Sequence, residues 1–287
     1  MNLQNIISEI EKVDPEVYGK MDTRRSAMKK FANVSGKIAV ASIPFALGSM
    51  FNTAYGQTTS TVNDVLNFAL TLEYLEAEFY NNIVASPVYA TIPAPAQAAL
   101  AKIKDDENKH VAFLKSVLGT AAIAKPTFDF TAGSGSGTGP FAGYLASYAV
   151  QLAMAQTFED TGVRAYKGQA PALQGNRTVL TAALEIHSVE ARHASHIRQM
   201  RRALNVAIPS GQVVKPWITL NQTGIDYAPG NSAIQLSYNG EEVVSQAGAT
   251  ITGIGGNSFI DANAASEAFD EPLTTAQVLA IVTPFFG

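Results

Sequence analysis

The sequence predicts an all-α core, a four-helix bundle with one long crossover, followed by a C-terminal extension of short strands and loops. Three observations favour this fold class. Four segments carry apolar residues at the three- and four-residue spacing of amphipathic helices. Each segment is about 24 to 29 residues long, against roughly 11 to 12 for an average globular helix. The linkers are short, long and short in turn, as expected for two antiparallel pairs joined by a crossover.

The helix boundaries follow from local signals at the ends of the apolar periodicity. Pro87 stops the first helix, Gly119 caps the end of the second, and Asn176 is an N-cap for the fourth. The crossover contains the Gly/Ser-rich segment 133–137. The four helices are therefore expected over residues 62–85, 95–118, 140–168 and 176–204.

The character of the chain changes after Leu204, where short alternating runs are separated by Gly, Asn and Pro. Such runs predict short strands, here over residues 212–220, 233–238 and 249–254. A brief final helix is expected from Thr275 to Val282. The domain prediction is an export signal over 1–56, the bundle over 57–204 and the extension over 205–287.

The N-terminal segment has the order of a signal peptide: basic residues and then an apolar run. Arg24-Arg25 resembles the start of a twin-arginine signal, although Ala27 stands where such signals prefer a large apolar residue. The run from Ile38 to Phe51 spans about 14 residues, fewer than a membrane anchor needs. A cleaved signal ending before Gln57 is therefore expected, which predicts an exported, periplasmic or cell-envelope protein that meets the membrane only through this segment. A basic amphipathic helix is the alternative.

Composition excludes several classes of function. The net charge of −4 and the absence of a basic block in the body argue against nucleic-acid binding. Cysteine is absent, which excludes disulfides, thiolate metal sites and a cysteine nucleophile. Any metal must therefore be held by oxygen and nitrogen ligands.

Two of the expected helices carry a Glu-x-x-His pair, Glu107 with His110 and Glu190 with His193. Residues three apart lie on one helical face. A single pair is weak evidence, because Glu and His at this spacing commonly form a solvated face. Both pairs, however, fall near the midpoints of their helices, where a bundle brings its helices to the same level.

The other two helices each contribute a glutamate, Glu73 and Glu159, followed seven residues later by Tyr80 and Tyr166. This set of residues resembles the ligands of ferritin-like di-iron and di-manganese proteins. The tyrosines would then orient the glutamates, with plain packing as the alternative. Glu76, one turn from Glu73, is an alternative or further ligand. The remaining histidines, His187 and His196, are expected to lie at the surface or to cap.

The charges of the four glutamates are an independent reason to expect metal at this level of the bundle. Four carboxylates in an apolar core would repel one another and carry a large desolvation cost. Two divalent cations would neutralise them. Carboxylate and imidazole ligands suit iron or manganese, zinc could also bind, and magnesium seldom selects imidazole.

Three stretches resemble the ferritin-like family that includes desiccation-related proteins. They are LTLEYLEAEFY over 70–80, VEARHA over 189–194 and ASEAFDEPL over 265–273. More distantly, the order of ligand residues resembles ferritin, bacterioferritin and rubrerythrin, although rubrerythrin's thiolate-bound iron module cannot exist here. The resemblance implies two divalent metal ions, iron before manganese.

The leading hypothesis is an oxidoreductase that oxidises ferrous iron or reduces dioxygen or peroxide in stress protection. A di-manganese protein that dismutates peroxide is a related version. The alternative is a non-catalytic stress or desiccation-related protein, structural or surface-binding, in which metal serves as a staple. Iron storage in a shell ranks lower, because the extension after Leu204 would have to fit in the shell. Assembly into a homo-oligomer stays open.

Overall fold

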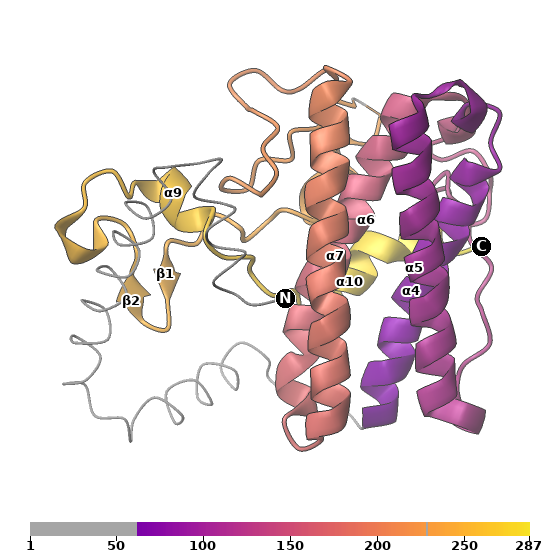
Figure 1. Ribbon diagram of the computed structural model, residues 1–287, viewed down its shortest axis with the longest axis horizontal. Helices are drawn as coiled ribbons and strands as arrows, with labels where there is room; N and C mark the ends of the chain where they lie inside the picture. The colour runs from indigo at the N-terminus through magenta and orange to yellow at the C-terminus, as the bar shows by residue number, and fades with distance from the viewer. Residues whose placement is uncertain (1–61, 228) are drawn as a thin grey trace, which may run out of the picture. The chain divides into compact units, whose positions relative to one another are not determined.

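The computed structural model describes residues 62–227 and 229–287. The predicted export signal lies outside the described residues. The core contains four long helices, drawn as two neighbouring pairs in Figure 1. Helix α4 packs most extensively on α5, and α6 on α7. The bounds are α4 (Val62–Val84), α5 (Ala94–Leu118), α6 (Tyr148–Gln169) and α7 (Arg177–Ala203).

The local signals correctly predicted the ends of α4, α5 and α7 to within about two residues. The side chain of Asn176 accepts a hydrogen bond from the backbone N–H of Val179, as an N-cap does. Gly119 follows α5 at a positive φ of 55°. None of the helices in residues 62–227 and 229–287 is long and apolar enough to cross a membrane.

The predicted start of the third helix at residue 140 was wrong, because α6 begins at Tyr148. Gly143 has a φ of 85°, a left-handed conformation that a continuous α-helix cannot contain. Only a short 3₁₀ turn, Tyr144–Ala146, follows it. Ser147 then caps α6 by accepting a hydrogen bond from the backbone N–H of Val150. The crossover is correspondingly longer than expected.

The crossover is organised around Asp129, a carboxylate in its middle. One oxygen accepts hydrogen bonds from the backbone N–H and hydroxyl of Thr131. The other accepts from the backbone N–H groups of Gly135 and Gly137, each at 3.0 Å. These hydrogen bonds, led by that of the Thr131 hydroxyl, hold the pKa of Asp129 below its ordinary value. The Gly/Ser-rich loop is thus folded around one ionised side chain.

The strands predicted in the C-terminal extension were largely wrong. Residues 212–220 form no helix or strand, and residues 233–238 overlap a short helix, α8 (Asn231–Leu236). Within 249–254 only β2 (Ala249–Thr250) is a strand, paired antiparallel with β1 (Ser245–Gln246). Ile218, Ile234 and Tyr238 of these runs are buried in a core cluster that they share with residues of the long helices. The alternation of apolar and polar residues in these runs therefore does not reflect an extended sheet.

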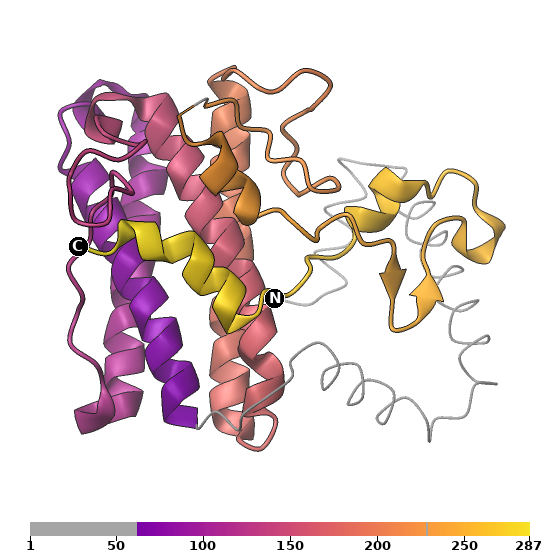
Figure 2. The same ribbon diagram turned by 180° about the vertical axis from the view of Figure 1, so that it is seen from behind.

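Two further helices complete the extension. The short helix α9 (Ala262–Ser266) was not predicted, whereas α10 (Thr275–Val282) matches its predicted bounds. Thr274 and Gln277 form a reciprocal capping box at the start of α10. Helix α10 crosses the bundle in Figure 2. Its buried residues Val278, Ile281 and Val282 form an apolar cluster with Leu72 of α4 and Ala165 of α6.

Buried charged residues bind the extension to the bundle. Arg164 of α6 donates to the backbone carbonyls of Ser237 and Asn239, at 2.6 and 3.0 Å, and pairs with Glu241 at 2.6 Å. One helical turn earlier, Asp160 pairs with Arg198 of α7 and accepts a hydrogen bond from Tyr238. The extension is therefore held along α6 by the Arg164–Glu241 ion pair and by hydrogen bonds, as well as by apolar contacts.

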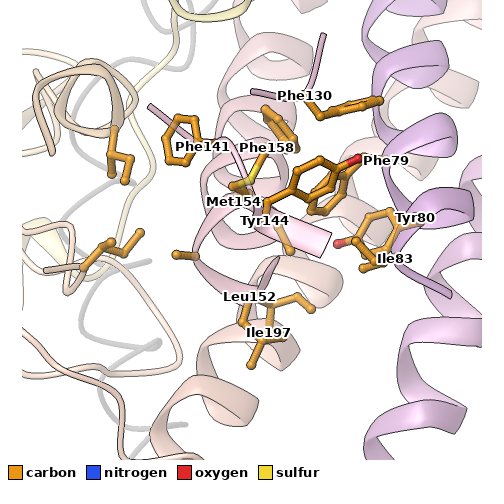
Figure 3. Packing of buried hydrophobic residues seen from close by; sticks show 14 of the residues in the cluster. Phe79, Tyr80, Ile83, Phe130, Phe141, Tyr144, Leu152, Met154, Phe158 and Ile197 are labelled. Carbon is orange, nitrogen blue, oxygen red and sulfur yellow. The ribbon is translucent and has the colours of Figure 1, made fainter. Parts of the chain in front are cut away.

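The bundle interior consists of two main apolar clusters with polar residues between them. Figure 3 shows the first cluster, which is rich in aromatic side chains. In it, the rings of Phe79 and Phe158 pack edge to face, with their centroids 5.1 Å apart. The second contains Leu66, Leu70 and Leu114. On each of the four helices, the predicted ligand residues lie in sequence between members of the two clusters.

Candidate metal centre

The structure brings together the six residues that the sequence analysis proposed as ligands. Helix α4 contributes one, α5 two, α6 one and α7 two, all near midlength. The four glutamates have 0% exposure, and His193 has 6%. The residues are Glu73, Glu107, His110, Glu159, Glu190 and His193.

These side chains form two overlapping groups among the described residues. Glu73 and His110 belong to one group and Glu159 and His193 to the other, while Glu107 and Glu190 belong to both. Within each group, one potential ligand atom of every residue lies within 4.8 Å of the others. The cluster is compatible with a dinuclear metal site.

Both imidazoles direct Nδ1 toward the carboxylates. The Nδ1 atom of His110 lies 3.2 Å from oxygens of Glu73 and Glu107, and 3.3 Å from Glu190. That of His193 lies 2.9 Å from Glu107 and 3.3 Å from Glu159. The two rings are 6.4 Å apart between centroids. The nitrogens therefore stand where each could bind a separate ion.

Several of these atoms lack a hydrogen bond despite their burial. They are Oε1 of Glu107, Oε2 of Glu159, both carboxylate oxygens of Glu190 and Nδ1 of His193. The 2.9 Å approach of His193 to Glu107 thus lacks hydrogen-bond geometry. Orphaned buried polar atoms are costly and uncommon. Their oxygen and nitrogen chemistry, converging on shared space, fits divalent cations.

The pKa values reflect crowding of negative charge. Burial raises the pKa of Glu73 to about 7 and raises that of Glu190 well above its ordinary value. Glu107 is the exception: burial is outweighed by the hydrogen bond from His110 and by the charge of the nearby His193 imidazole, which hold its pKa at about 2. Burial opposes protonation of His110, but its hydrogen bonds to Glu107 and Glu73, together with the Glu190 carboxylate 3.3 Å away, raise its pKa. In the metal-free protein, protons therefore balance the charge that cations would otherwise neutralise.

The two tyrosines connect the glutamates of opposite helices. Tyr80 of α4 donates to Glu159 of α6 at 2.5 Å, and Tyr166 of α6 donates to Glu73 of α4. The seven-residue spacing places each tyrosine on the same helix as one of the glutamates, but each tyrosine donates its hydrogen bond to the glutamate of the other helix. Burial raises the pKa of both phenols, so both remain protonated donors.

Glu76 is buried beside the cluster but belongs to neither group. Gly162 of α6 faces it: a methyl group at this position would lie 3.0 Å from Oε2 of Glu190 and 3.2 Å from Oε1 of Glu76. Sequence reasoning overlooked this glycine. A glycine inside a helix costs about 1 kcal/mol relative to alanine, so its presence could have signalled a close approach.

Asp106 is a second residue that sequence reasoning missed. Its carboxylate lies 3.5 Å from Nε2 of His193, on the side of the ring away from the carboxylate cluster. A carboxylate in this place orients a ligand imidazole and favours the tautomer that leaves Nδ1 free. In the sequence, Asp106 could have been identified from its position next to Glu107 on a helix that carries proposed ligands.

The other histidines stand apart from the cluster. Nδ1 of His187 is 3.0 Å from the backbone carbonyl of Val163, as a donor would be, so this ring packs against α6. His196 is exposed on α7. Neither belongs to the two groups of potential ligands.

Gly162→Ala tests whether the space beside α6 shapes the site. The added methyl group should displace the carboxylates of Glu190 and Glu76 and weaken Mn²⁺ binding by about tenfold or more, since overpacking costs about 1 to 3 kcal/mol. Calorimetric titration would measure the affinity. Gly175→Ala is the control, because a methyl group there meets no atom within 4 Å. Equal affinities in both variants would refute this role of Gly162.

Comparisons with known proteins agree with this architecture. The family model described as a ferritin-like domain matches residues 61–203, which include all four long helices and all six clustered residues. Comparison with curated proteins and with solved structures found no significant match. Through the domain formed by residues 61–203, the chain belongs to the ferritin-like superfamily.

Proposed function

We propose that this protein is an oxidoreductase with two iron ions in the bundle, which oxidises ferrous iron or reduces dioxygen or peroxide in stress protection. The observation that carries the proposal is the overlap of the two groups through Glu107 and Glu190. Glu107 and Glu190 would therefore help to hold both ions. Two redox-active ions held in this way would supply the electron transfer to a small oxidant.

The number of ligands supports a reactive site. Six side chains for two ions leave coordination positions open, and open positions distinguish a reactive site from a closed structural one. Iron bound at both positions would supply the electrons that reduce the oxidant.

The surrounding residues would control the geometry of the site. Tyr80 and Tyr166 each hold one carboxylate oxygen, leaving the other oxygen of Glu159 and Glu73 for a cation. Asp106, 3.5 Å from Nε2 of His193, would favour a proton on that nitrogen, so that Nδ1 would carry the free lone pair toward a cation. The apolar clusters on either side restrict water.

Manganese is the principal alternative metal, because carboxylate and imidazole ligands suit both ions. A di-manganese site would dismutate peroxide with the same residues. The alternative function is a stress-related structural or surface-binding protein stabilised by metal. It would be favoured if neither the iron-loaded nor the manganese-loaded protein reacts with dioxygen or peroxide.

The shared ligands should matter most for metal content. We expect wild type to hold about two ions per chain, as comparable bundles do. Glu107→Ala and Glu190→Ala should lose metal from both positions, whereas Glu73→Ala should lose mainly one ion. Elemental analysis of the purified variants would count the metal.

His193→Ala should also weaken metal binding, and its matched control is His196→Ala, which lies one turn away on the same helix and is exposed. Undiminished metal in both Glu107→Ala and His193→Ala would show that the ligands are elsewhere.

Activity with ferrous iron as substrate should depend on the complete set of ligands. Wild type should consume dioxygen or peroxide and develop ferric absorbance faster than free iron does. Glu159→Ala should fall to about the rate of free iron while keeping its fold, because removing one of the crowded carboxylates relieves repulsion in the metal-free protein. Stopped-flow absorbance would measure the rates, with His196→Ala as control. Equal rates in wild type and Glu159→Ala, together with no peroxide breakdown on manganese loading, would contradict the proposal.

We also propose that the protein is exported, because Arg24-Arg25 is followed by an apolar run, as in an export signal. Intact mass spectrometry of protein isolated from its own host should give a mature chain beginning near Gln57. Fractionation should place that chain outside the cytoplasm. An intact Met1 on cytoplasmic protein would rule export out.

A further inference from the structure

A second site lies at the end of the bundle nearest the start of α4. A pocket of about 150 Å³ opens there between the four long helices, and we call it the apolar pocket. Its walls include Leu66 and Ala69 of α4, Phe113 and Val117 of α5, Tyr166 of α6 and Ala182 of α7. We propose that the apolar pocket binds the end of an uncharged aliphatic chain belonging to a small molecule free in water.

The lining offers a ligand no charge, and two of its polar side chains are already bonded elsewhere. No charged residue lines the apolar pocket. The hydroxyl of Tyr166 donates to Glu73, and the amide of Gln169 donates to Thr275 at 2.9 Å. Thr178, at the exposed start of α7, is the remaining polar residue of the lining. A buried hydroxyl or charge would therefore be left largely unpaired, which selects hydrocarbon.

The size of the pocket limits how much of a ligand it can hold. An enclosed apolar cavity of about 150 Å³ admits a molecule such as benzene, with about six carbons. The rim is apolar as well, since Phe113 and Val117 are 40% and 45% exposed. A longer chain can thus extend from the pocket across the rim without losing apolar contact.

The favoured source of the chain follows from the origin of the hydrophobic effect. An aliphatic chain gains free energy by leaving water. A lipid chain that already lies in a bilayer would gain little by moving into a pocket that covers only its end. A free aliphatic molecule is therefore the occupant that the pocket favours.

The apolar pocket adjoins the carboxylate cluster without sharing its ligands. The ring of Tyr166 lines the pocket, whereas its hydroxyl reaches Glu73. A bound chain would lie one side chain away from the proposed metal centre. Binding itself requires no metal, so this inference stands or falls independently of the proposed function.

The experiment titrates the full-length, metal-free protein with 1-octanol and, as the matched ligand, 1,8-octanediol. Saturable binding of 1-octanol with a negative heat-capacity change is expected. The diol should bind about tenfold or more weakly, because either end that enters carries a hydroxyl. Methyl NMR should show shifts at Leu66 and Ile186 of the pocket lining, and none at Leu152 or Ile197 in the first apolar cluster.

Two variants locate the binding. Ala182→Leu fills the apolar pocket from α7 and should weaken 1-octanol binding about tenfold or more, whereas Ala203→Leu, at the exposed end of the same helix, should not. Val117→Asp places a charge on the exposed rim and should also weaken binding. Because position 117 is exposed, this second variant gives an answer even if Ala182→Leu fails to fold.

Circular dichroism would establish that each variant is folded. The inference is overturned if 1-octanol does not bind saturably, or if the diol binds equally well. It is also overturned if folded Val117→Asp and Ala182→Leu bind 1-octanol like wild type.

Discussion

Burial of several carboxylates at one level of the bundle is the constraint on which the rest of this structure depends. Four glutamates with 0% exposure face a shared space, and Glu76 is buried next to them. Each ionised carboxylate taken out of water costs several kcal/mol unless an opposite charge or a proton compensates it. In the metal-free protein the compensation comes from imidazoles and raised pKa values. The same carboxylates and imidazoles can release those protons and bind divalent cations in their place. The cluster therefore retains oxygen and nitrogen atoms that are available as metal ligands.

The two apolar clusters make this arrangement possible and increase its consequences. They pack the helices on both sides of the carboxylates, so that the ligand-bearing turns stay at one level. They also lower the local polarity, which strengthens every hydrogen bond and charge interaction between them. The exchanged tyrosines extend this coupling. Because Tyr80 holds Glu159 and Tyr166 holds Glu73, the orientation of a glutamate on one helix depends on the packing of the other.

The C-terminal extension contributes to the centre indirectly, through α6. Asp160 follows Glu159 in sequence and is fixed by Arg198 and Tyr238, while Arg164 is fixed by the backbone of the extension. These contacts oppose rotation of α6 about its axis and thus help to keep Glu159 pointing into the bundle. Removing one partner of a buried ion pair generally costs about 3 to 5 kcal/mol. An extension without strands of useful length can therefore still be a firm part of the fold.

The sequence by itself determined the long helices, most of their ends and the six residues that cluster in the core, because helical periodicity and capping depend on neighbours three or four residues apart. It did not determine the late start of α6 or the fate of the alternating runs, since their apolar residues are buried by contacts with distant parts of the chain. Only the tertiary structure decided which glutamate each tyrosine holds, why position 162 must be small and where Asp106 stands. It alone revealed the apolar pocket, whose walls come from all four helices. The physical reason is the same throughout: pairing across helices depends on their relative rotation and spacing, which only the packed core sets.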